Sequence, residues 1–157
     1  LFPGLRIGYV VLPRELVEPM TVARTLLDGH SAPLAQMTLA RFMEGGHFGA
    51  HVRAMRGIYA ERLGLLAGLV DKHLAGIAEA QVPAGGLQMP CLLKSGLPER
   101  AAIDAARHAG IALLGLSSLY AAGDGKPGFL MGFAAYTPSE IEEAVGKLAT
   151  ALQAAMR

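Results

Sequence analysis

The sequence has one cysteine, no tryptophan and few charged side chains. Cys91 is that single cysteine, which excludes an intrachain disulfide and favours a reducing compartment, and we interpret it as a small buried apolar residue. No apolar run approaches the roughly 18 to 20 residues that cross a bilayer. The chain does not open with a basic segment and a cleavage site, so we see no secretion signal. We therefore expect a cytoplasmic protein with no membrane partner.

An excess of charge of one sign is also absent. The 14 Lys and Arg residues balance 13 Asp and Glu residues, for a formal net charge of +1. This balance gives no electrostatic footprint for nucleic acid, which normally needs a clustered basic face, so any DNA binding would lie outside this chain. Apolar side chains are abundant, at 52% against 17% charged residues. The surplus predicts a covered interface, and the length suits one domain with its own core.

The apolar periodicity predicts strands alternating with helices, hence an α/β or α+β fold. We expect Ser31 to cap the second helix, and Gly45 with Gly46 to end it. The expected helices cover residues 14–27, 31–44, 48–74, 98–108 and 138 onward, and the expected strands cover 6–12, 78–82, 87–94, 111–114 and 128–135. The third helix is the predicted spine, with one apolar stripe formed by Val52, Met55, Tyr59, Leu63, Leu66 and Val70.

The last helix has the clearest start signal in the chain. Thr137 is placed as its N-cap, Pro138 stands at the first helical position, and Glu140 at the third completes a capping box. The apolar residues that follow recur at helical spacing and predict the buried face, namely Ile141, Val145, Leu148 and Leu152.

One arginine near the N-terminus stands at a turn that leads into an apolar segment. Pro3 and Gly4 stiffen and tighten the turn, and Arg6 follows them closely. A guanidinium can form paired, charge-assisted hydrogen bonds to a phosphate, so the segment is typical of the edge of a phosphate site. A structural arginine paired with a buried carboxylate is an equally good interpretation of the residues alone.

Other candidate motifs are weaker. The glycines from Gly123 to Gly128 match a dinucleotide fingerprint, but they precede a strand and include a proline, which favours a plain loop. His47 and His51 have the spacing of two metal ligands without a third, so surface or interface histidines are the better interpretation. Ser117 lacks the second glycine of a nucleophile elbow. A solvated or ion-paired helix face is expected for Arg53, Arg56 and Arg62.

The stretch Leu1–Val11 resembles the segment after the cofactor lysine in fold-type I pyridoxal-phosphate enzymes, whose pattern is Pro-Gly-Leu-Arg-(Ile/Leu)-Gly-Tyr. Further likeness lies in the blocks Ala40–Phe48, His51–Arg62 and Gly85–Gln88, and it extends to about Thr150. Within this family the chain is similar to the aminotransferase-like domain of MocR-type regulators. These are GntR-family proteins in which that domain follows a winged-helix DNA-binding domain.

The resemblance implies that Arg6 and Gly4 bind the cofactor phosphate in the intact protein. The cofactor lysine of the family precedes that arginine by seven residues, which places it two residues before Leu1 and outside this chain. The remaining lysines lack a matching context, namely Lys72, Lys94, Lys126 and Lys147. The chain is thus expected to be a C-terminal part without catalytic residues, activity, bound cofactor or metal of its own.

The implied domains divide the chain into three parts. Residues 1–30 would end the large pyridoxal-phosphate domain, residues 31–74 would form long connecting helices, and residues 75–157 would form the small domain. The small domain is expected to hold a small mixed sheet covered by helices.

Two positions implied to contact the substrate depart from the family pattern. Gln88 stands where the family usually has histidine, and Leu130 where many aminotransferases have the arginine that grips the substrate carboxylate. Leucine cannot bind a carboxylate, so another group binds the acid, or the ligand is atypical, or the domain senses rather than transaminates.

Three functions remain open at this point. The first is the effector domain of a regulator, with an amino compound as ligand and DNA bound through an absent N-terminal domain. The second is part of a true aminotransferase acting on an amino acid. The third is a structural dimerisation module, since the family forms homodimers through this fold.

Overall fold

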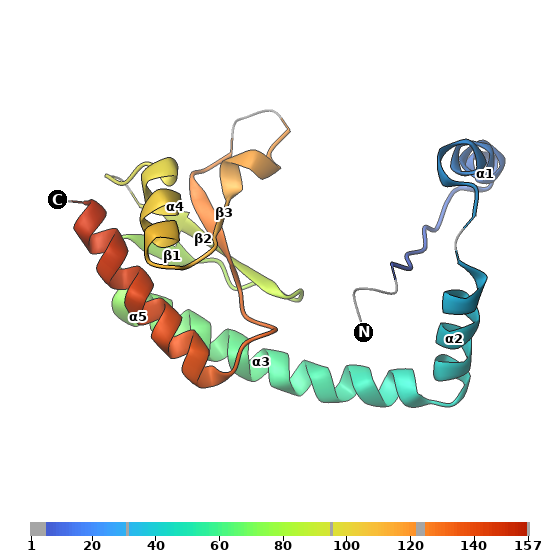
Figure 1. Ribbon diagram of the computed structural model, residues 1–157, viewed down its shortest axis with the longest axis horizontal. Helices are drawn as coiled ribbons and strands as arrows, with labels where there is room; N and C mark the ends of the chain where they lie inside the picture. Colours follow the sequence, from blue (N-terminus) through green and yellow to red (C-terminus); the bar gives the residue numbers. More distant parts are fainter. Residues whose placement is uncertain (1–5, 31, 95, 122–124, 157) are drawn as a thin grey trace. The chain divides into compact units, whose positions relative to one another are not determined.

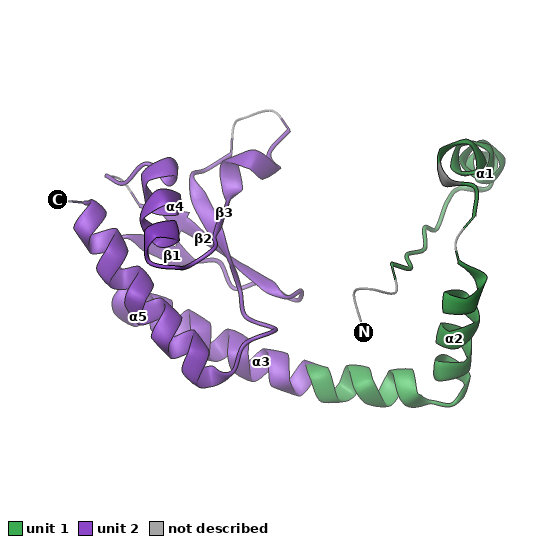
Figure 2. Ribbon diagram, viewed as in Figure 1, with its two compact units in different colours: residues 1–55 green, residues 56–157 purple. Residues whose placement is uncertain are grey.

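The computed structural model describes residues 6–30, 32–94, 96–121 and 125–156. The chain forms two compact units, residues 1–55 and 56–157 (Figure 2). Helices precede and then alternate with strands along the sequence (Figure 1). The elements are α1 (Arg14–Asp28), α2 (Pro33–Glu44), α3 (His47–His73), β1 (Ala78–Ala80), β2 (Gln88–Leu93), α4 (Glu99–His108), β3 (Leu114–Gly115), the 3₁₀ helix η2 (Leu116–Leu119), β4 (Gly128–Gly132) and α5 (Pro138–Ala155).

The three N-terminal helices occur where the sequence predicts them. Helix α1 ends before Gly29, whose φ of 72° is accessible to glycine at little cost. Helix α2 starts with Pro33 in its first turn, and the predicted cap Ser31 lies outside the described residues. Gly46, with φ of 75°, separates α2 from α3 as expected.

The strand predicted over residues 6–12 is wrong, because those residues have no regular secondary structure. A strand needs a neighbour for its backbone hydrogen bonds, and no described strand pairs with this segment. Its apolar side chains are largely exposed, with Tyr9 at 94%.

No described residue of the first unit is buried. Leu26, Leu34 and Met37 of α1 and α2 are exposed although they are apolar, and Leu27 reaches 86% exposure. The exposure of apolar side chains to water costs free energy, so these helices present a surface suited to a partner.

The second unit contains a four-stranded sheet in the order β1-β2-β4-β3. Every neighbouring pair is antiparallel, so the predicted mixed sheet is wrong in this respect. The short connection over residues 81–87 reverses the chain between β1 and β2, and such a turn joins only antiparallel strands. The third strand is also displaced, to Leu114–Gly115, because its pairing with Leu130 and Phe129 decides its position.

One face of the sheet forms the core together with helices α3, α4 and α5 (Figure 1). Leu66 and Val70 of the predicted stripe are buried, and Tyr59 and Leu63 pack against the core. The predicted buried face of α5 is confirmed in full. The strands contribute Met89, Cys91, Phe129 and Met131.

Cys91 is a buried apolar residue, as the sequence predicts. Burial, with a smaller contribution from the Asp71 charge, raises the pKa of its thiol to about 12. The thiol therefore stays protonated at neutral pH and is a poor nucleophile.

The predicted capping box at α5 is present. The backbone N–H of Thr137 donates to Glu140 Oε2 at 2.7 Å, and the backbone N–H of Glu140 donates to Thr137 Oγ1 at 3.4 Å. Two N–H groups that would otherwise lack a partner are thereby satisfied.

We expect Thr137→Ala to lower the free energy of unfolding by about 1 kcal/mol, because the N-cap acceptor is lost. Urea unfolding followed by circular dichroism measures the change. Thr150→Ala is the matched control, since the Thr150 hydroxyl bonds back to the Gly146 carbonyl on the exposed side of the same helix. Equal effects of the two substitutions would contradict the capping role.

Candidate functional site

Arg6 has the properties of an available anion ligand. Its side chain is exposed, and it makes no hydrogen bond or ion pair with any residue that the structure describes. Its φ of 48° lies in the left-handed region, which a non-glycine residue rarely adopts and which often accompanies ligand sites. Gly4, the second predicted phosphate residue, lies outside the described residues. An internal carboxylate partner for Arg6, the alternative interpretation, is not found among them.

Gln88 and Leu130 come together in the second unit. Leu130 pairs directly with Pro90 of β2 and with Leu114 of β3. Because side chains alternate along a strand, Gln88 and Leu130 both lie on the sheet face opposite the buried Met89 and Met131. The structure thus brings two residues separated by 42 positions of sequence into the lining of one cavity.

That cavity has a volume of about 630 Å³ and lies between β4, the segment before β3 and the first half of α5. Three charged residues line it, Glu140, Glu143 and Lys147. Lys147 Nζ forms an ion pair with Glu143 Oε1 at 2.6 Å. Hydrogen bonds from the backbone and side chain of Thr137 hold the pKa of Glu140 below its ordinary value. Lys147 is the single cation among the described lining residues, and it is paired with Glu143.

The sequence did not predict the hydrogen-bond partner of Arg62. Its guanidinium donates to the carbonyl oxygen of Ala134, in the turn between β4 and α5, and it is half-buried. It also helps to keep the pKa of Glu140 low. Helix spacing suggested a solvated or ion-paired face, but it cannot reveal a carbonyl partner 72 residues away.

Glu99 at the start of α4 joins three segments that are distant in sequence. Its carboxylate accepts hydrogen bonds from Ser117 Oγ, from Ser117 N at 3.2 Å and from Gly128 N at 2.8 Å. Burial raises the pKa of Glu99, but these hydrogen bonds outweigh it and leave the pKa below its ordinary value. The Ser117 hydroxyl donates to this carboxylate, which is a structural role.

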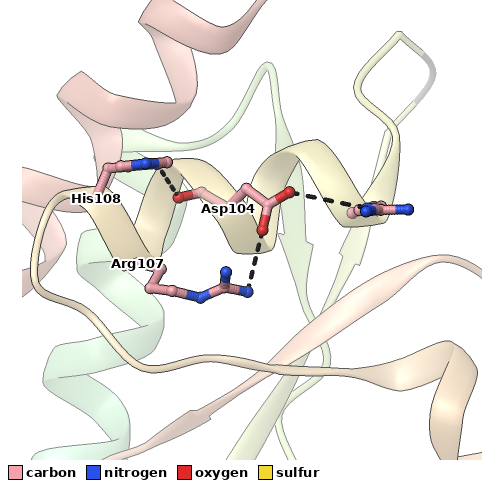
Figure 3. Close-up of polar contacts among 4 residues, drawn as sticks. Asp104, Arg107 and His108 are labelled. Atoms are coloured by element: carbon pink, nitrogen blue, oxygen red, sulfur yellow. Dashed lines mark hydrogen bonds and ion pairs between the residues drawn. The ribbon is translucent and has the colours of Figure 1, made fainter.

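The histidines belong to no metal-binding cluster in the part of the chain that the structure describes. The His47 ring lies 5.6 Å from the ring of Phe42, centroid to centroid. On α4, His108 Nδ1 lies 2.8 Å from the Asp104 carbonyl oxygen, and Arg107 forms a 3.0 Å ion pair with the Asp104 carboxylate (Figure 3). Exposed contacts of this kind contribute little to stability. Within the described ranges, no helix is both long and apolar enough to cross a membrane.

Comparisons with known proteins identify what this arrangement resembles. No family model matches the chain. It is 29% identical over 154 residues to the probable rhizopine catabolism regulatory protein MocR of Rhizobium meliloti, covering 98% of this chain and 31% of that protein. It is 28% identical over 151 residues to the HTH-type transcriptional regulator YhdI of Bacillus subtilis (strain 168), covering 96% and 32%.

The fold matches that of LysN, the α-aminoadipate aminotransferase of Thermus thermophilus, solved in complex with N-(5'-phosphopyridoxyl)-L-leucine. The TM-score is 0.88 at 24% identity, with 98% of this chain and 39% of LysN covered. The chain resembles the C-terminal, aminotransferase-like part of MocR-type regulators.

The likeness to MocR-type regulators confirms the family resemblance and the α/β, fold-type I architecture expected from the sequence. The chain spans about a third of the length of these curated relatives. Dependence on pyridoxal phosphate is implied for the family by its aminotransferases.

Proposed function

We propose that this chain is the C-terminal part of a pyridoxal-phosphate-dependent, aminotransferase-like effector domain of a transcriptional regulator. The observation that carries the proposal is the similarity to the regulator MocR over 98% of the chain, on an aminotransferase fold. In this proposal residues 1–30 end the large domain, residues 31–74 connect, and residues 75–157 form the small domain of a cytoplasmic protein. DNA would be bound by a separate N-terminal domain.

The residues present fit the phosphate of the cofactor but not its covalent attachment. The Arg6 guanidinium is exposed and available, as a phosphate ligand must be. None of the chain's four lysines stands seven residues before Arg6, where the family pattern has the attachment lysine; they are Lys72, Lys94, Lys126 and Lys147. When bound, pyridoxal phosphate supplies an aldehyde that reacts with primary amines and a ring that accepts electrons.

The chain itself would bind and orient. Arg6 would hold the phosphate with paired hydrogen bonds, and the lack of a side chain at Gly4 would let the backbone approach it. The sheet face would present Gln88 and Leu130 to an amino compound, without a cation for its carboxylate. Leucine in place of the family's carboxylate-binding arginine fits a domain that senses its ligand better than one that transaminates an amino acid. Ligand binding would shift the effector domain from one conformation toward another, and this shift would change the DNA-binding domain.

Two other functions each have one supporting observation. The aromatic-amino-acid aminotransferase 1 of Thermococcus litoralis matches 100% of the chain at 22% identity, which favours a true aminotransferase. The exposed apolar side chains of α1 and α2 favour a dimerisation module, and a homodimer is expected in all three proposals.

We expect Arg6→Ala in the intact protein to weaken the affinity for pyridoxal phosphate roughly 30-fold, because charge-assisted hydrogen bonds to the phosphate are lost. Titration followed by the visible absorbance of the cofactor measures the affinity. Arg14→Ala is the matched control, an exposed arginine at the start of α1. An unchanged affinity for Arg6→Ala would contradict the phosphate role.

The same titration on the 157-residue chain alone is a second control, and it should leave the spectrum of the free cofactor. A new, saturable band there would contradict the absence of an attachment lysine. In the intact protein, an amino compound should change the affinity for an operator DNA without producing a keto acid. Steady formation of keto acid would instead support the aminotransferase.

A further inference from the structure

The cavity of the second unit has the size and wall chemistry of a small-molecule site. Its volume of about 630 Å³ lies within the range of known ligand cavities, roughly 300 to 1,000 Å³. Aliphatic side chains from three segments line it, namely Ile111, Leu113, Leu114, Leu130 and Ala144. Such a wall favours the apolar part of a ligand by excluding water from it.

The charges at the cavity are already matched within the protein. Lys147 is paired with Glu143 at 2.6 Å. Glu140 accepts hydrogen bonds from the backbone and hydroxyl of Thr137, and the charge of Arg62 acts on it as well. The Lys147–Glu143 pair is exposed and therefore weak, so a carboxylate or ammonium would be disfavoured here mainly by losing its hydration against the aliphatic side chains.

Two neutral polar groups at the cavity remain available. The exposed side chains of Gln88 and Tyr136 line it, and neither side chain has a hydrogen-bond partner among the described residues. Together they offer N–H and O–H donors and oxygen acceptors. A small number of polar groups in an apolar cavity is the usual means of orienting an uncharged ligand.

We propose that this cavity binds an uncharged, largely apolar organic group, with Gln88 and Tyr136 forming its hydrogen bonds. The inference rests on the proposed function in one respect: the bound group is taken to belong to the amino compound, at the end opposite its amine. It assigns the ligand to amines with a hydrocarbon or amide end, and excludes those with a second charge at that end.

Three probes with the same six-carbon chain test the charge of the ligand. Hexanamide, hexanoate and hexylammonium are titrated into the 157-residue chain, and the methyl NMR signals of Leu114 and Leu130 are followed. Hexanamide should shift these signals saturably, with an affinity about 10-fold above that of either ion. Equal binding of hexanoate, or shifts spread over the whole surface, would overturn the proposal.

Two alanine-to-phenylalanine substitutions test where hexanamide binds. Ala144→Phe should fill the cavity and weaken hexanamide about 10-fold or more, whereas Ala154→Phe, on the exposed end of the same helix, should leave it unchanged. Unchanged binding to Ala144→Phe would overturn the assignment to this cavity. Leu130→Arg should reverse the preference toward hexanoate, because it supplies a free guanidinium.

The two proposals can fail separately. If amino compounds change the cofactor absorbance of the intact protein while the chain ignores hexanamide, the cavity assignment is wrong and the proposed function stands. If hexanamide binds as expected while the intact protein does not bind pyridoxal phosphate, the cavity is a ligand site and the proposed function is wrong.

Discussion

Gly128→Ala should lower the free energy of unfolding by about 3 kcal/mol, because the added methyl group meets atoms that cannot move away. A Cβ at this buried position would overlap the backbone carbonyl oxygen of Cys91, and it would lie 2.6 Å from Leu116 Cδ1. The carbonyl belongs to the neighbouring strand β2, so relief requires separating β2 from β4. Since these strands carry the core residues of the sheet, the whole second unit should lose stability.

Gly132→Ala is the matched control for this prediction. Gly132 lies in the same strand, and a Cβ there would meet nothing within 4 Å. Alanine restricts the unfolded chain more than glycine, so this variant should be neutral or more stable by about 0.5 kcal/mol. Urea unfolding followed by circular dichroism compares the two variants. Similar midpoints would show that Gly128 is not held against β2.

Glu99→Gln should lower the free energy of unfolding by about 2 kcal/mol at neutral pH, because hydrogen bonds to a charged carboxylate are lost. The value is at the low end for several such bonds, since the half-buried side chain stays partly in contact with water. An amide presents only one oxygen to the three donors from Ser117 and Gly128. Gly115→Ala should have a similar effect, since its Cβ would lie 3.0 Å from Glu99 Cδ and displace the carboxylate.

The effect of Glu99→Gln should depend on pH with a definite sign. The pKa of Glu99 is lower in the folded protein than its ordinary value, so the folded state favours the charged form. Its contribution is therefore complete above the unfolded pKa, about 4.3, and is lost as the pH falls through the folded pKa. Urea unfolding from about pH 7 to about pH 3 should show the difference between wild type and Glu99→Gln shrinking only at the acidic end.

Glu142→Gln serves as the control for charge alone, since Glu142 is exposed on α5. It should change neither the stability at neutral pH nor its slope with pH. A difference for Glu99→Gln that stays constant over the whole pH range would show that the carboxylate charge has no part in joining α4 to η2 and β4.

The sequence predicted those features that depend on neighbouring residues. The capping box at Thr137, the glycine breaks between helices and the apolar stripe that reaches Leu66 and Val70 each involve residues a few positions apart. Helix geometry converts such spacing directly into one face or one turn, so these predictions needed no knowledge of the rest of the chain. The burial of Cys91 followed from its chemistry.

Contacts between distant segments could not be predicted in this way. The strand expected over residues 6–12 failed because a strand depends on a partner that local pattern does not reveal. The hydrogen bond from Arg62 to a carbonyl and the hydrogen bonds to Glu99 each connect segments far apart in sequence. The cavity is likewise lined by distant segments. The role of Arg6 in phosphate binding stays a prediction.

The amino-acid sequence by itself determined the helices, their caps, the buried side of α5 and the resemblance to an aminotransferase-like domain. Only the tertiary structure decided the antiparallel order of the strands, and with it the meeting of Gln88 and Leu130 in the lining of one cavity. The physical reason is that helix hydrogen bonds close within four residues, whereas sheet pairing is settled by which distant segments pack together.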